Sequence, residues 1–143
     1  MVTVKGKRGT LTKAFKHLKV EITEVKEVDP ATKQTKRFFE INTYMSTYKQ
    51  AAVLYTVASH IRNMFKGVTR GFRYKMHIVK KHFRIEIKIN PTNLEIGRFL
   101  GERIVKVVKL HEGVTASKNE KNQEEIWFDG NDIDKVSLTC KLI

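Results

Sequence analysis

The sequence predicts an α+β fold of two tandem repeats, each a small antiparallel sheet packed on one helix. Apolar and polar residues alternate between residues 2 and 41, and apolar residues then recur at spacings of three and four up to residue 68. Alternation returns at residue 72, and a second helical pattern follows near residue 136. Strands followed by a helix therefore occur twice. We expect domains 1–80 and 81–143, divided near residues 79–82, with the second helix incomplete at the C-terminus.

The N-terminal segment predicts a β-hairpin followed by two more strands. β-Branched runs flank Gly6-Lys7-Arg8-Gly9, whose glycines can adopt the positive φ angles of a tight reversal. This places two charges at the tip of the hairpin. Alternation then indicates a strand around residues 20–22, and a polar loop through Asp29-Pro30 leads to another strand at 39–41.

The most regular pattern in the chain predicts a helix of about 20 residues. Thr47 and Gln50 have the spacing of a capping box at its start, and Gly67 stands where a glycine would end it. The residues expected on its apolar side are Ala51, Leu54, Tyr55, Ala58, Ile61, Met64, Phe65 and Val68.

A strand with one apolar and one cationic face is expected next. Its two faces are Phe72, Tyr74, Met76 and Ile78 on one side and Arg73, Lys75 and His77 on the other. Further strands are predicted around 83–89, 94–99, 104–110 and 126–128, with a turn at Asn90-Pro91-Thr92-Asn93. Asp129-Gly130-Asn131-Asp132 reads as a turn and N-cap that leads into a last helix.

The net charge of +13 requires an anionic partner, because a domain of this size normally carries a charge of about 2 to 8. Residues 1–85 contain 19 Lys and Arg against 5 Asp and Glu, whereas residues 86–143 contain 9 against 10. No acid occurs from residue 41 to residue 85, so we expect a basic surface that nothing within it neutralises. Phosphate backbones favour such a surface through counterion release. A membrane surface is the main rival, but no helical pattern combines lysines on one face with large apolar residues on the other.

Several motifs of the sequence fit a plain structural role better than a specific binding function. The Gly-x-x-Gly spacing of residues 6–9 matches the loop of KH domains, but that loop joins two helices, so a hairpin tip is favoured. Aromatic residues at 72 and 74 could stack on bases as in an RRM sheet, yet they share a face with apolar residues and are expected in the core. Asp129, Asp132 and Asp134 do not fit a calcium loop, so they are expected in turns and caps.

Other residue types argue against metal sites, disulfides and catalysis. The five histidines lack the spacing of metal ligands, and the single Cys140 can form neither an internal disulfide nor a Cys-type zinc site. No apolar run is long enough to span a bilayer, and the N-terminus does not read as a signal peptide. We therefore expect a cytoplasmic protein with no cofactor, no small-molecule substrate and no enzymatic activity.

Four blocks of sequence occur in the order found in one known family. They are Val2-Thr3-Val4-Lys5-Gly6-Lys7-Arg8-Gly9-Thr10-Leu11, Gly67-Val68-Thr69-Arg70-Gly71-Phe72-Arg73-Tyr74-Lys75-Met76, Leu94-Glu95-Ile96 with Phe99-Leu100-Gly101-Glu102, and Gly130-Asn131-Asp132-Ile133. In these blocks the chain resembles the universal large-subunit ribosomal protein family called L-six in bacteria and L-nine in eukaryotes, in particular its eukaryotic and archaeal branch.

The resemblance implies a structural constituent of the large ribosomal subunit without catalytic residues. It implies binding to large-subunit rRNA near the sarcin-ricin loop and the base of the stalk, where translation factors dock, beside neighbouring ribosomal proteins. The basic residues expected to hold phosphates are Lys5, Lys7, Arg8, Arg70, Arg73, Lys75, Lys80, Lys81, Arg98, Arg103 and Lys106.

Two alternatives stay open from the sequence. A free-standing KH-like or RRM-like module would bind short single strands of RNA. An enzyme acting on nucleic acid would need an acidic metal-binding cluster in the basic region, and residues 41–85 contain none.

Overall fold

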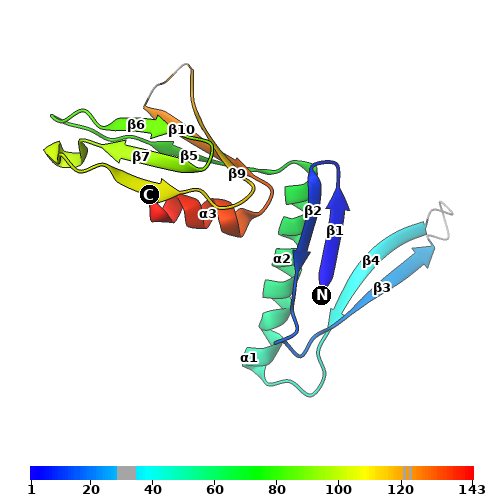
Figure 1. Ribbon diagram of the computed structural model, residues 1–143. Helices are drawn as coiled ribbons and strands as arrows, with labels where there is room; N and C mark the ends of the chain where they lie inside the picture. The colour runs from blue at the N-terminus through cyan, green and yellow to red at the C-terminus, as the bar shows by residue number, and fades with distance from the viewer. Residues whose placement is uncertain (29–34, 121, 123) are drawn as a thin grey trace. The chain divides into compact units, whose positions relative to one another are not determined.

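The computed structural model describes residues 1–28, 35–120, 122 and 124–143, and it is a mixed α/β structure of small antiparallel sheets and helices (Figure 1). The described chain divides into two compact units, Met1–Thr3 with Thr12–Arg62 and Val4–Leu11 with Asn63–Ile143. The elements are β1 Val2–Gly6, β2 Gly9–Lys13, β3 Glu21–Val28, β4 Thr35–Asn42, α1 Tyr48–Ala51, α2 Val53–Thr69, β5 Phe72–His77, β6 Glu86–Ile89, β7 Asn93–Gly97, the 3-10 helix η1 Phe99–Gly101, β8 Lys106–Lys109, β9 Val114–Lys118, β10 Glu125–Gly130 and α3 Ile133–Leu142. The antiparallel sheets, the long helix and the C-terminal helix agree with the expected fold class.

The first unit is built around a small apolar core. Phe15, Val57 and Ile61 are buried there, and half-buried aliphatic residues from strands, from the segment before β3 and from α2 pack on them. β3 and β4 form an antiparallel hairpin in which Ile22 pairs with Ile41. The predicted strands are therefore confirmed, while the polar loop expected through Asp29-Pro30 lies outside the described residues.

The long helix begins where the capping residues predicted it. The backbone N–H of Thr47 donates to Oε1 of Gln50 at 3.0 Å, and the N–H of Ala51 donates to the carbonyl of Thr47 at 2.9 Å. Ala52, between α1 and α2, keeps helical dihedral angles of φ −59° and ψ −24°.

The apolar face of α2 differs from the predicted one. Val57 is fully buried, whereas Tyr55 is 84% exposed and Phe65 is 40% exposed. The buried positions Val57, Ile61, Met64 and Val68 still follow a helical period, but the face is turned away from Tyr55. The prediction that Tyr55 lies on the buried face is therefore wrong, because its spacing fits the helical period but its ring lies at the surface.

The predicted end of the helix at Gly67 is wrong, because α2 continues to Thr69. The left-handed conformation that ends the helix belongs to Gly71, with φ +76°, whose N–H donates to the carbonyl of Lys66 at 3.1 Å. Gly67 serves close packing instead. A Cβ there would fall on the carbonyl oxygen of Asn131 and 3.2 Å from its carbonyl carbon.

The second unit contains two three-stranded antiparallel sheets and α3. Their strand orders are β5-β10-β9 and β6-β7-β8, and α3 packs on the first sheet (Figure 1). The shared core contains Leu94, Val114, Ile126, Phe128 and Val136, all buried. β9 was not predicted, and β6 and β8 are shorter than the predicted strands.

The N-cap predicted for the last helix is confirmed, but part of the turn predicted before it is wrong. Asp132 is the N-cap, and its Oδ1 accepts the N–H of Asp134 at 3.0 Å. Asp129, expected in the same turn, instead lies in β10. A Cβ on Gly130 would lie 2.5 Å from Cγ2 of Val136, so glycine allows α3 to pack closely on β10. Cys140, half-buried on α3, touches this core, and burial raises the pKa of its thiol.

Candidate nucleic-acid interface

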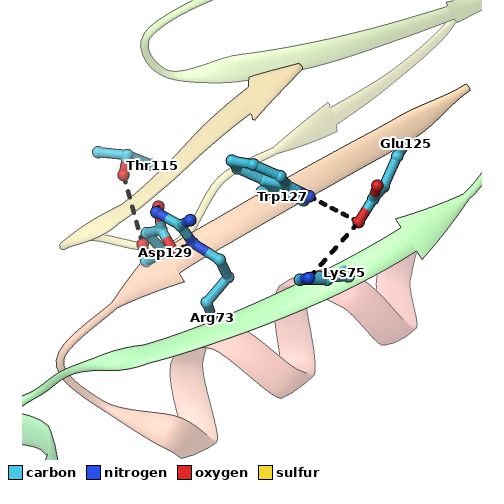
Figure 2. A network of polar contacts seen from close by, with 6 residues as sticks. All are labelled: Arg73, Lys75, Thr115, Glu125, Trp127 and Asp129. Carbon is cyan, nitrogen blue, oxygen red and sulfur yellow. Dashed lines mark hydrogen bonds and ion pairs between the residues drawn. The ribbon is translucent and has the colours of Figure 1, made fainter. Parts of the chain in front are cut away.

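The outward face of β10 carries acidic and aromatic side chains opposite the cations of β5. Glu125, Trp127 and Asp129 alternate along β10 with the buried residues Ile126 and Phe128. In the antiparallel register, Asp129 faces Arg73 and Trp127 faces Lys75. Residues more than fifty positions apart in the sequence therefore meet side by side on one sheet face (Figure 2).

Arg73 is held by a bidentate ion pair. Its Nε lies 2.7 Å from Oδ1 of Asp129, and its Nη2 lies 2.9 Å from Oδ2. The guanidinium carbon also lies 4.5 Å from the ring centre of Trp127, a cation–π distance. The hydrogen bonds from Arg73 to Asp129 raise the pKa of the guanidinium further above its usual range. This side chain is directed at its own sheet.

Lys75 on β5 and Lys80 beyond the end of that strand each face a carboxylate. Lys75 lies 4.0 Å from Glu125, whose Oε1 accepts the indole N–H of Trp127 at 2.7 Å (Figure 2). The indole hydrogen bond is the main cause of the lowered pKa of Glu125. Lys80 lies 2.8 Å from Glu124, and its hydrogen bond lowers the pKa of that carboxyl group. β5 is therefore flanked by carboxylates from the C-terminal half.

The expectation that nothing neutralises the basic surface is wrong for this strand. The acid-free stretch 41–85 is acid-free only along the sequence, because β10 supplies Glu125 and Asp129 across the ladder. Exposed ion pairs of this kind stabilise a fold by little, but they compete directly with phosphate for the same cations. Arg73, Lys75 and Lys80 are thus weaker candidates for RNA contact than the sequence indicated.

The turn of the β1–β2 hairpin lies at the C-terminal end of α2 (Figure 1). The N–H of Arg8 donates to the carbonyl of Val68 at 3.1 Å, and a Cβ on Gly6 would lie 2.6 Å from Cγ2 of Val68. This close approach brings together four exposed cations, Lys5, Lys7, Arg8 and Arg70, which we call the cationic tip. Because the Gly-x-x-Gly turn joins two strands, the KH interpretation of this motif is wrong.

Arg8 is the anchored member of the cationic tip. Its Nε donates to Oδ1 of Asn131 at 3.0 Å, and Nδ2 of Asn131 donates back to the carbonyl of Arg8 at 2.9 Å. A Cβ on Gly71 would lie 2.8 Å from Cζ of Arg8, so the guanidinium lies flat against glycine backbone. An amide partner fixes the side chain without cancelling its charge. Within the described residues, Lys5, Lys7 and Arg70 have no carboxylate partner.

The remaining predicted cations also divide into those that face a carboxylate and those that do not. Nε of Arg98 lies 3.3 Å from Glu86, and Lys106 lies 3.4 Å from Glu102 and 4.9 Å above the ring of Phe99. Lys81 and Arg103 are exposed and face no carboxylate in the part of the chain that the structure describes. Of the eleven predicted residues, six therefore keep an uncancelled charge, and the structure gathers four of these in the cationic tip.

A concave site lies between residues 82–86 and 97–105. Its volume is about 730 Å³, and Phe83, Arg84, Arg98 and Arg103 are among the residues that line it. Arg98 and Arg103 were among the predicted RNA-binding residues. Phe83 and Arg84 were not, although Arg84 belongs to the acid-free stretch that could have indicated it.

Neither a metal cluster nor a membrane span emerges from the described residues. They contain no group of three or more His, Cys, Asp and Glu side chains placed to hold a metal ion. No helix among them is both long and apolar enough to cross a bilayer. Phe72, Met76 and Ile78 are half-buried, and Met76 and Ile78 pack against the core of the second unit. Tyr74 was expected on the same face but is 36% exposed, so the prediction that it lies in the core is wrong.

Comparison with known proteins places these features in a family. The family model described as Ribosomal protein L6 matches residues 1–71. Large ribosomal subunit protein uL6 of Ignicoccus hospitalis is 37% identical over 140 residues, covering 97% of this chain and 70% of the relative. The chain belongs to the uL6 family. Large ribosomal subunit protein uL6A of Schizosaccharomyces pombe is 39% identical, covering 97% and 69%, and uL6 of Tetrahymena thermophila is 32% identical, covering 100% and 72%.

The family assignment confirms the resemblance seen in the four sequence blocks. uL6 proteins are structural components of the large ribosomal subunit and not enzymes, as the sequence predicted. The structure adds the distribution of charge, which the family assignment does not give. It shows a strand face whose charges are paired, an unpaired cationic tip and a concave site in the second unit.

Proposed function

We propose that this chain binds folded large-subunit rRNA as a structural constituent of the ribosome, in the cytoplasm, near the sarcin-ricin loop and the base of the stalk. Membership of the uL6 family supports the ribosomal role. The position near the stalk, where translation factors dock beside neighbouring ribosomal proteins, rests on the sequence resemblance. Basic side chains hold phosphates in this proposal, and the shape of the folded RNA gives specificity.

The cationic tip is the observation that indicates which residues bind the rRNA phosphates. Lys5, Lys7, Arg8 and Arg70 are exposed, the segments that carry them lie against each other at the end of α2, and no carboxylate among the described residues faces them. Arg8 is preoriented by Asn131, so less side-chain freedom is lost when it meets a phosphate. We assign the tip the main phosphate contacts, with Lys81 and Arg103 as further contacts. Arg73, Lys75, Lys80, Arg98 and Lys106 contribute less, because each already faces a carboxylate.

The duplication and its boundary belong to the same proposal. Strands followed by α2 and strands followed by α3 repeat one order of elements, which supports two tandem copies. The division into 1–80 and 81–143 remains a prediction.

Co-sedimentation with ribosomes tests the proposed function. The full chain is expected to sediment with large subunits at low salt and to dissociate as salt rises, because counterion release weakens phosphate binding. The double variant Lys7→Glu with Arg70→Glu is expected to dissociate at markedly lower salt. Lys16→Glu, an exposed charge reversal outside the tip, serves as the control and should dissociate with the unmodified protein.

Two outcomes would reject the proposal. A chain that never sediments with the large subunit, even at low salt, is not a ribosomal constituent. Tight binding of short unstructured oligonucleotides with no preference for large-subunit rRNA would favour the free-standing single-strand module instead.

A further inference from the structure

The concave site of the second unit is an open surface hollow, lined largely by exposed and charged side chains. Its volume of about 730 Å³ falls within the range of roughly 300–1,000 Å³ typical of ligand pockets. One wall comes from residues 82–86 and the other from the turn at 97–105. An aromatic ring and several arginines line it, a combination suited to a ligand with a flat ring and negative charge.

Phe83 supplies the flat surface. The ring is 57% exposed although it is apolar, and it is packed against the backbone of Gly101. A Cβ at Gly101 would lie 3.2 to 3.5 Å from three atoms of the ring, so glycine lets the ring lie close to the backbone here. The ring is thereby fixed on one side and open on the other. Nucleic acid bases stack on exposed aromatic rings held in this way.

The two acidic side chains of the site are paired with cations, whereas two of its arginines are not. Glu86 is paired with Arg98 at 3.3 Å, and Glu102 is paired with Lys106 at 3.4 Å. Both acids at the site are therefore occupied. Arg84 and Arg103 line the same cavity, and neither faces a carboxylate among the residues that the structure describes. A guanidinium group presents two parallel donors to the oxygens of a phosphate.

The turn that forms the second wall is held in a costly conformation. Arg98 and Leu100 have φ angles of +57° and +52°, and Gly101 has φ +82°. Positive φ is uncommon for residues other than glycine, and such residues concentrate at functional sites and ligand clamps. This observation is independent of the charge and of the exposed ring, and it indicates the same segment.

We infer that this cavity binds one unpaired nucleotide of the rRNA, an inference that rests on the proposed function. Its base stacks on Phe83, and Arg84 and Arg103 hold the phosphates on either side. Arg98 keeps Glu86 away from those phosphates by pairing with it. A base within a duplex is covered by its neighbours, so the site distinguishes a bulged or looped nucleotide from regular helix.

Two RNA hairpins test the inference. They share one stem sequence, and one of them carries a single bulged 2-aminopurine nucleotide whose fluorescence falls on stacking. The full chain is expected to bind the bulged hairpin about tenfold more tightly than the paired one, the order expected for one stacked base. Phe83→Leu, which keeps apolar bulk, and Arg103→Gln should each remove most of this preference. Lys88→Gln, an exposed charge on β6 outside the cavity, should leave the preference unchanged.

The outcomes separate this inference from the proposed function. Equal binding of the two hairpins, or a preference that survives both Phe83→Leu and Arg103→Gln, would overturn the inferred nucleotide site. If co-sedimentation with large subunits persists in that case, the proposed function stands without it. Preference lost in Phe83→Leu together with reduced quenching of 2-aminopurine would support stacking on this ring.

Discussion

The salt dependence of rRNA binding should reveal how many cations are available to phosphate. Each phosphate contact contributes about 0.7 to 0.9 to the slope of log K against log salt. If all eleven predicted residues bound phosphate, the slope would be about −9. The structure leaves six of them uncancelled, and together with Arg84 of the concave site these give a slope of about −5 to −6. Between about 50 and about 200 mM salt, the first value means a loss of roughly 10⁵-fold in affinity and the second roughly 10³-fold.

Filter binding of the full chain to large-subunit rRNA at several salt concentrations measures this slope. Lys7→Gln should reduce its magnitude by about 0.8, the loss of one contact. Arg73→Gln removes the same formal charge but should leave the slope unchanged, because Asp129 already holds that guanidinium at 2.7 and 2.9 Å. Near-ultraviolet circular dichroism verifies that both variants are folded.

A slope near −9, or an equal effect of Arg73→Gln and Lys7→Gln, would contradict the division into paired and unpaired cations. The carboxylates of β10 would then yield their partners to phosphate on binding.

Three further predictions concern stability and its pH dependence. Gly67→Ala should lower the free energy of unfolding by about 1–2 kcal/mol in urea titration, because a clash with the backbone of Asn131 outweighs the gain of about 1 kcal/mol in helix propensity. Leu94→Ala, at a fully buried position, should lower it by about 2–5 kcal/mol. The pKa of Glu125 is held below its ordinary value of 4.5 chiefly by Trp127, so its stabilising effect is complete above pH 4.5 and is lost as the pH falls further. Glu125→Gln should therefore make the unfolding free energy fall less steeply below pH 4.5.

Matched measurements keep these predictions testable. Thr56→Ala, an exposed substitution on α2, should raise stability slightly, so it reports helix propensity without a clash. A Gly67→Ala protein more stable than the unmodified chain would show that Asn131 does not approach α2 so closely. Acid unfolding profiles that coincide for Glu125→Gln and the unmodified chain would remove Glu125 from the pH-sensitive groups.

Local patterns predicted the elements that local chemistry determines. The glycine-bounded hairpin, the capping box at Thr47 and the N-cap at Asp132 depend on neighbours within a few residues, and each occurs where it was predicted. β9 was missed because Val114 and Ala116 alone give its segment little apolar alternation. Gly67 was misread because a glycine needed for close approach resembles one that ends a helix.

The candidate site could be predicted in composition but not in arrangement. The eleven cations were visible from charge, whereas their partners depend on a strand register that joins residues about fifty positions apart. Glu125, Trp127 and Asp129 alternate with Ile126 and Phe128, so the sequence does show which face of β10 they occupy. It does not show that β5 is the neighbouring strand.

The pairing of β5 with β10 has a consequence for the newly made chain. Arg73 and Asp129 are 56 residues apart, so a ribosome synthesises the cationic strand well before the carboxylates that balance it. Until that later segment emerges, the strand carries its full charge amid the abundant RNA of the cell. When β10 pairs with β5, its carboxylates neutralise these cations. Completion of the sheet therefore also lowers the nonspecific affinity of this strand for RNA.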